Sequence, residues 1–167
     1  MQKAFGPHTI DLFAARHNTL LPRYFARFLD QEAAAEDALA QDWSEEHNPY
    51  AHPPFGLLPL VLRKVRRDQV KALTLVTPVW PAQHWLPDLM SMSVAPPTIL
   101  TSDPLLTPHL SSHKPPSRPR WSTAVWRISG KVIHGCVAPN VKTAIVRTLT
   151  PRTHIDGQEG KILHIKE

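Results

Sequence analysis

The feature that most constrains the fold is an amphipathic helix followed directly by a buried strand. Apolar residues recur at helical spacing from Leu57 to Val65, while basic residues fill the opposite face. Residues 72–77, ALTLVT, form a short apolar run that Pro78 ends, which predicts a buried strand. Because crossover helices join parallel strands, this order favours an α/β fold.

A second strand is predicted near the N-terminus. Residues 9–14, TIDLFA, form an apolar run with one acidic residue inside it, as in a strand buried on both faces. We therefore predict a partial doubly wound α/β sheet, with parallel strands at 9–14 and 72–77 packed against a helix at 57–68. Residues 31–40 are rich in strong helix formers, and residues 46–54 are rich in turn-forming residues.

Proline separates the front of the chain from the rear. The 167 residues include 18 prolines but only 6 glycines, and seven of the prolines fall between Pro96 and Pro119. Proline lacks a backbone donor and breaks helices. The sequence predicts three segments: a domain over 1–92, a Pro-rich linker over 93–123, and a poorly ordered basic tail over 124–167, so that the C-terminal half is largely disordered.

Charge and composition limit the classes of site. Of the net charge of +5, residues 71–167 carry the excess, with 11 Lys and Arg against 5 Asp and Glu. A basic segment suits contact with phosphates, although a solvated tail explains it as well. The single cysteine, Cys136, excludes an internal disulfide and a Cys-rich zinc site, and the 10 histidines show no ligand spacing, so no metal site is predicted. The chain has neither a long apolar stretch nor the apolar core of a signal peptide, which predicts an intracellular protein of the cytoplasm or nucleus.

Two motifs carry a chemical pattern. Asp11 and Phe13 lie at the end of the first predicted strand, and His52-Pro53-Pro54-Phe55 precedes the predicted helix. Amino-methyltransferases hold S-adenosylmethionine in a loop after an early strand, and they bind the target amine with a later Asp/Asn-Pro-Pro-aromatic loop. An oxygen of the first residue accepts hydrogen bonds from the amine, the prolines make the loop rigid, and the aromatic ring stacks on the flipped base.

The order of the motifs along the chain carries a resemblance to a known family. Five pieces follow one another in the order that the family has, and together they cover roughly residues 4–130: IDLFAARHNTLLPRYFARF, EDALAQDW, AHPPFGLLPLVLRKV, TLVTPVWPAQHWLPDL and AVWRISG. The series resembles the phage-type DNA adenine methyltransferases. It resembles still more closely the version of that domain in DIRS-like tyrosine-recombinase retrotransposons, where it follows reverse transcriptase and ribonuclease H.

The resemblance implies a truncated, Rossmann-like methyltransferase domain. Its target-amine loop would be His52, Pro53, Pro54 and Phe55, and its contacts with S-adenosylmethionine would come from Asp11, Phe13 and Asp37. Two departures weaken catalysis. His52 stands where the family has Asp or Asn, and Arg16-His17 occupies a loop that lacks a Gly-rich turn. Losing one preorganised polar group costs several kcal/mol of transition-state stabilisation.

These departures lead to a prediction of an inactive domain. The chain is interpreted as a fragment of a reverse transcriptase/ribonuclease H polyprotein that is not an enzyme, and that binds S-adenosylmethionine only if activity survives. Its expected partners are DNA or RNA and the other domains of the parent polyprotein. The alternatives are an active DNA adenine methyltransferase and a translated relic without function. His52 separates the first two hypotheses, and a cooperative thermal transition separates a folded domain from a relic.

Several residues have a structural interpretation beside the functional one. Asp11 is equally suited to capping a turn, and Asp37 and Asp42 to simple solvation. The stripe Arg63, Lys64, Arg66 and Arg67 is either a nucleic-acid contact or the solvated face of a helix. Trp43, Trp80 and Trp85 are expected in the core, and Trp126 with Arg127 is expected to dock a neighbouring domain.

Overall fold

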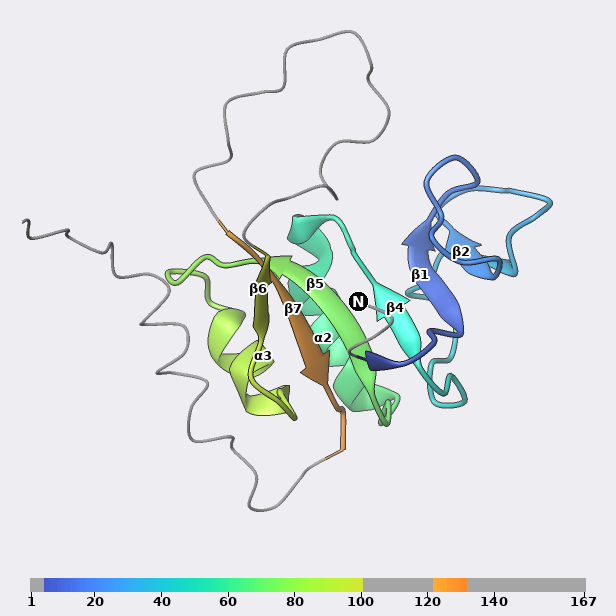
Figure 1. The fold of residues 1–167 in the computed structure, drawn as a ribbon. Coiled ribbons are helices and arrows are strands. Elements are labelled where there is room, and N and C mark those ends of the chain that lie inside the picture. Colours follow the sequence, from blue (N-terminus) through green and yellow to red (C-terminus); the bar gives the residue numbers. More distant parts are fainter. Residues whose placement is uncertain (1–4, 101–121, 132–167) are drawn as a thin grey trace, which may run out of the picture.

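The computed structural model describes residues 5–100 and 122–131, which form a mixed α/β fold around a seven-stranded sheet (Figure 1). The strands are β1 (Ile10–Ala14), β2 (Tyr24–Ala26), β3 (Ala35–Glu36), β4 (Pro49–Ala51), β5 (Leu73–Pro78), β6 (Thr98–Leu100) and β7 (Thr123–Ile128). The helices are the 3-10 turn η1 (Phe55–Leu57), α2 (Leu58–Arg67) and α3 (Leu86–Met92).

The strand order is β3-β2-β1-β4-β5-β7-β6. From β3 to β5 all neighbours are parallel, whereas β7 is antiparallel to both β5 and β6. The chain moves outward from β1 to β3 and then returns to the other side of β1 with β4, so the topological switch point lies between β1 and β4. In doubly wound sheets, ligands bind outside the carboxyl ends of the strands at this point. The predicted α/β class is confirmed, and β4 lies between the two predicted strands.

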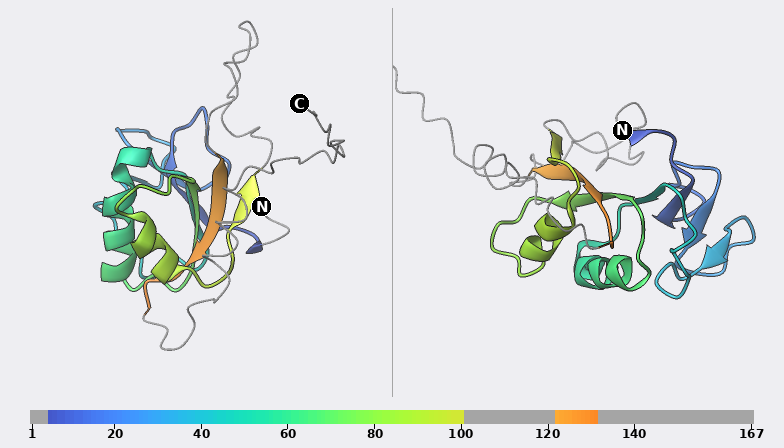
Figure 2. Two further views of the ribbon diagram at one scale, coloured as in Figure 1. Left: turned by 90° about the vertical axis from the view of Figure 1, so that its left-hand side faces the viewer. Right: turned by 90° about the horizontal axis from the view of Figure 1, so that it is seen from below.

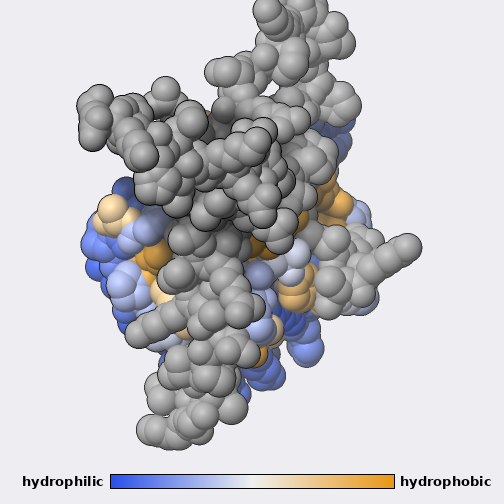
Figure 3. Space-filling view, turned by 60° about the vertical axis from the view of Figure 1, so that its left-hand side comes forward, coloured by the Kyte–Doolittle hydropathy of each residue, from blue (hydrophilic) through white to orange (hydrophobic). Residues whose placement is uncertain are grey.

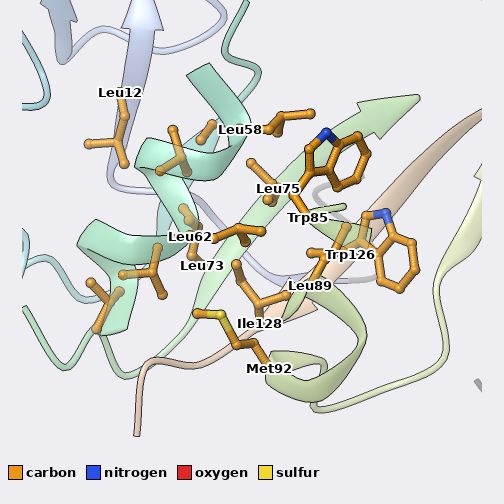
Figure 4. Packing of buried hydrophobic residues seen from close by; sticks show 14 of the residues in the cluster. Leu12, Leu58, Leu62, Leu73, Leu75, Trp85, Leu89, Met92, Trp126 and Ile128 are labelled. Atoms are coloured by element: carbon orange, nitrogen blue, oxygen red, sulfur yellow. The ribbon is translucent and has the colours of Figure 1, made fainter. Parts of the chain in front are cut away.

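The helices pack on one face of the sheet (Figure 2). The first turns of α2 direct Leu58 and Leu62 toward Leu73 and Leu75 of β5, where the side chains are almost completely buried (Figure 4). In Figure 3, the left-hand rim, on the side of the helical layer, is mostly hydrophilic. The amphipathic pattern of the sequence therefore predicted the buried face of α2 correctly.

The sheet continues past the boundary predicted at residue 92. Strand β7 pairs with β5 from Leu73↔Ile128 to Pro78↔Thr123, and the Trp126 indole donates to the Thr77 hydroxyl at 2.9 Å. Trp126 is fully buried, so this part of the predicted tail is an ordered strand, and its interpretation as a docking island is wrong. Strand β6 lies within the predicted linker. The remainder of the linker and tail, 101–121 and 132–167, lies outside the described residues.

Two further expectations are corrected between β1 and α2. Residues 31–40 contain β3 and turns instead of a helix, and Asp37 has a φ of 46°, which no α-helix accommodates. The turn-rich passage 46–54 contains β4, a central strand of only three residues that starts at Pro49. A proline is tolerated at the first position of a strand.

Two structural properties bear on the classes of site. In the part of the chain that the structure describes, the helices are too short and too polar to cross a membrane. Among residues 5–100 and 122–131, no three His, Cys, Asp or Glu side chains are grouped as a metal site requires.

Candidate functional site

The His52–Phe55 loop leaves β4 at the carboxyl edge of the sheet, beside the switch point. Pro53 is buried, and the Pro54 carbonyl accepts a hydrogen bond from the Leu57 N–H at 2.8 Å as η1 begins. The two fixed φ angles of the prolines make this exit rigid. The sequence therefore places a stiff loop where doubly wound proteins bind ligands.

Aromatic rings gather around this loop. The Phe55 ring lies 5.3 Å from the ring of Trp80 in an edge-on arrangement, and 6.3 Å from the imidazole of His52. Trp80 comes from the loop after β5 and is half-buried. Trp80 packs against the core as a partly buried side chain, as the sequence predicts. Its contact with Phe55 was not predicted, because nothing in the sequence shows that β5 is the neighbour of β4.

The carboxyl end of β1 forms the other side of the switch point. The register between β1 and β2 shifts between Asp11 and Ala14, so the pairing of the two strands is irregular there. The half-buried Phe13 meets Trp43 edge-on at 6.1 Å. Trp43 is fully buried and donates through its indole N–H to the Ala38 carbonyl at 2.8 Å, so its assignment to the core is confirmed.

Asp11 supports the loop that follows β1. Its carboxylate oxygens accept hydrogen bonds from the backbone N–H of Phe13 at 3.3 Å and of Leu20 at 3.5 Å. Burial raises the pKa of Asp11 to about 6, against the lowering effect of these two bonds. The geometry favours the turn-capping interpretation, and a contact with cofactor stays a prediction.

Asp37 lies on the carboxyl side of β3, on the surface. Its carboxylate accepts a hydrogen bond from the Leu39 N–H at 3.1 Å, and Asp42 similarly accepts one from Ser44 at 2.9 Å. Both carboxylates are exposed and close local turns. A role for Asp37 in binding cofactor also stays a prediction.

A pocket of about 450 Å³ lies between the loops that follow β1 and β2. It is lined by Ala15, Arg16, His17, Ala26, Arg27, Phe28, Leu29, Asp30, Gln31 and Glu32. Glu32 pairs with Arg16 at 2.8 Å, and Asp30 accepts a hydrogen bond from the Tyr24 hydroxyl at 2.8 Å.

The pocket has room for a nucleoside, but its lining gives no net negative charge to S-adenosylmethionine. The cofactor carries a positive sulfonium, a positive ammonium and a negative carboxylate group, and so one net positive charge. Both carboxylates of the pocket already have partners, and Arg16 and Arg27 add positive charge. Arg16 and His17 also bring side chains to a turn where glycine would let a ligand approach the backbone.

The predicted basic stripe is not one surface. Lys64 is buried, forms an ion pair with Asp68 at 2.7 Å, and lies 5.0 Å from the centre of the Trp43 ring. Its assignment to a nucleic-acid contact is therefore corrected. Arg67 donates a hydrogen bond to Asp68 at the end of α2. This end of the helix lies at the amino edge of the sheet, whereas the candidate site lies at the carboxyl edge. Arg63 and Arg66 remain exposed.

The burial of Asp11 predicts a pH-dependent stability. Because the folded chain raises this pKa from 3.8 to about 6, folding retains the proton that the unfolded chain releases. The contribution of Asp11 to the free energy of unfolding should therefore fall by about 2 kcal/mol as the pH rises from 4 to 7. In Asp11→Asn this fall should disappear, as measured by urea unfolding at several pH values. Glu45→Gln, at an exposed position, is the control, and an unchanged pH profile in Asp11→Asn would contradict the prediction.

The comparisons with known proteins agree with this fold. The family model for DNA N-6-adenine-methyltransferase (Dam) matches residues 1–91, which contain β1 to β5 and the 52–55 loop. None of the curated proteins compared with the chain matches it. The match covers more than half of the chain, and it includes the switch point and both sides of the candidate site. The chain belongs to the DNA N-6-adenine-methyltransferase (Dam) family.

Proposed function

We propose that this chain binds DNA by holding an unstacked adenine at the His52–Phe55 loop, and that it transfers no methyl group. The observation that carries the proposal is the position of this loop at the carboxyl end of β4, beside the switch point. Enzymes that act on a base in DNA take it out of the stack and enclose it between apolar or aromatic side chains.

The aromatic side chains support the binding of a base. Phe55 is half-buried, and its ring meets the ring of Trp80 at a centroid distance of 5.3 Å and an interplanar angle of 83°. We propose that the base stacks on the part of Phe55 that stays accessible. Stacking of a base on an aromatic ring contributes about 1–3 kcal/mol.

The proposed lack of methyl transfer is based on the residues at the position of the target amine and in the pocket after β1 and β2. An amine that attacks a methyl group must have its lone pair oriented by acceptors. An imidazole such as that of His52 offers at most one acceptor nitrogen, whereas a carboxylate or amide oxygen has two lone pairs. The pocket after β1 and β2 does not suit a cationic cofactor, and both oxygens of Asp11 accept backbone hydrogen bonds.

The experiment uses labelled S-adenosylmethionine and DNA. The unmodified chain should transfer no label above background, and titration calorimetry should show no binding of cofactor. His52→Asn restores the family's acceptor, but it too should stay inactive because the cofactor pocket is unchanged. Transfer by the unmodified chain would refute the proposal in favour of the second candidate, an active adenine methyltransferase, which the family membership supports.

Binding of the base is tested in a second experiment, by fluorescence. A short single-stranded oligonucleotide carries 2-aminopurine, a fluorescent analogue of adenine. Its fluorescence should change on binding to the unmodified chain and should change much less with Phe55→Ala. The control is Phe28→Ala, which removes an aromatic ring that is 71% exposed on the loop after β2. Equal signals from both variants would exclude Phe55 as the stacking partner.

We further propose that the domain derives from a DIRS-like retrotransposon, as an inactive accessory of a reverse transcriptase and ribonuclease H polyprotein. The sequence resemblance supports this origin, and the proposed role would be exercised in the cytoplasm or nucleus on DNA or RNA. Translation of the genomic DNA on both sides should reveal reverse transcriptase motifs upstream and a recombinase downstream. Unrelated flanking genes would contradict the proposed origin.

A further inference from the structure

We propose that a groove between α2 and α3 binds a backbone phosphate of the same DNA strand whose base lies at the His52–Phe55 loop. This inference rests on the proposed function and adds the path of the strand. The groove has a volume of about 280 Å³. It is lined by Pro59, Leu62, Arg63, Arg66, His84, Trp85 and Asp88.

The charges of the groove suit an anion. Arg63 and Arg66 lie one turn apart on the exposed face of α2, and the exposed imidazole of His84 faces them across the groove from the loop before α3. Asp88 is the single acidic residue of the lining, so two guanidinium groups outweigh one carboxylate. Arginine presents several N–H donors in a planar arrangement that matches the oxygens of a phosphate.

Arg66 is held in place before any ligand arrives. Its guanidinium contacts Asp88 at 3.1 Å and donates to the Ser91 hydroxyl at 2.9 Å. These contacts reduce the side-chain entropy that is lost on binding. Asp88 therefore has two opposite effects on the binding of an anion: it orients Arg66, and its own negative charge repels the anion. Substitution of Asp88 shows which effect is larger.

Two chain segments connect the groove with the aromatic site. Pro59 lies in the first turn of α2, directly after the η1 turn that carries Phe55. The loop between β5 and α3 carries Trp80, which contacts Phe55, and then His84, which lines the groove. A DNA strand with one base stacked on Phe55 would therefore pass over the start of α2 and bring a neighbouring phosphate group to Arg63.

Affinity and salt dependence test the groove. The unmodified chain is titrated into a labelled single-stranded oligonucleotide that contains 2-aminopurine, at several salt concentrations. Neutralising one phosphate contact lowers the slope of log affinity against log salt by about 0.7 for single strands. Arg63→Gln and His84→Gln should each weaken binding by roughly three- to tenfold at low salt, and Arg63→Gln should reduce the slope by about that amount.

Two further variants make the test specific. Asp88→Asn removes the negative charge from the groove and should strengthen binding by roughly two- to fivefold at low salt, since this charge repels phosphate. Lys71→Gln removes one positive charge from an exposed position at the amino edge of the sheet, far from the switch point, and should leave the affinity almost unchanged.

The outcomes separate this inference from the proposed function. If the 2-aminopurine signal depends on Phe55 but Arg63→Gln behaves like Lys71→Gln, the base site stands and the groove is refuted. If Arg63→Gln weakens binding while Phe55→Ala does not, the groove stands and the base site is refuted. If the unmodified chain binds no oligonucleotide, both proposals fail. Circular dichroism of each variant excludes unfolding as the cause of a loss.

Discussion

Replacing Trp126 by alanine is expected to lower the free energy of unfolding by about 3–5 kcal/mol, a large part of the stability of an ordinary domain. Trp126 is fully buried on β7, and it packs in the same core as Leu75 and Leu89 (Figure 4). The substitution removes the largest side chain of β7 and leaves a cavity. It also leaves the Thr77 hydroxyl without its indole donor. Urea unfolding followed by circular dichroism measures the loss.

Trp126→Phe is the matched control, because it keeps an aromatic ring and loses the hydrogen bond to Thr77. It should cost clearly less than Trp126→Ala. A second variant, Gly130→Ala, tests the end of the same segment, since a Cβ at Gly130 would lie 1.9 Å from the Val65 carbonyl oxygen. If Trp126→Ala and Gly130→Ala both leave the stability unchanged, β7 is not part of the folded core.

The second large effect is expected from Asp68, the acidic partner of a buried ion pair. Lys64 and Asp68 have side chains that are 4% and 6% exposed, and Asp68 also accepts a hydrogen bond from the Trp43 backbone N–H at 3.1 Å. Asp68→Ala leaves the ammonium group of Lys64 buried beside Trp43 without a counter-charge. Removing one partner of a buried ion pair lowers the free energy of unfolding by about 3–5 kcal/mol. The measurement is again urea unfolding at neutral pH.

The double variant Lys64→Met, Asp68→Leu distinguishes a lost charge pair from lost packing. Replacing both partners by apolar residues removes the uncompensated charge, so much of the stability should return. Arg67→Gln is the control, because the Arg67 side chain is 67% exposed and its bond to Asp68 should contribute less than about 1 kcal/mol. A double variant as unstable as Asp68→Ala would contradict an electrostatic origin.

The elements that sequence analysis predicted correctly are those with a local signal. Strand β5 is a continuous apolar run, and α2 has a clear helical period with a polar face. Strand β4 was missed because three residues that begin at Pro49 and lie shortly before Pro53-Pro54 look like a turn, and only pairing with β1 and β5 makes them a strand. Residues 31–40 have helical propensity, yet pairing of Ala35 and Glu36 with β2 overrides it.

The part of the candidate site that lies in one continuous segment could be predicted from the sequence. The 52–55 loop carries its own pattern, and the family match supports the domain around it. Trp80 and His84 were not identified, because their relation to Phe55 and Arg63 depends on the order of strands in the sheet. Lys64 was placed on the wrong surface because a periodic pattern does not show that Asp68 and Trp43 enclose its ammonium group.

The antiparallel strand β7 has a consequence for the order of events during synthesis. Strand β6 leaves the ribosome before β7, yet in the described sheet β6 pairs only with β7. Until residue 128 has emerged, β5 is an open edge of the nascent sheet, and β6 has no place to attach. Contacts between segments so distant in sequence slow folding and leave apolar edges exposed to aggregation. Among the described strands, the last to be made is thus the one that covers β5 and gives β6 its partner.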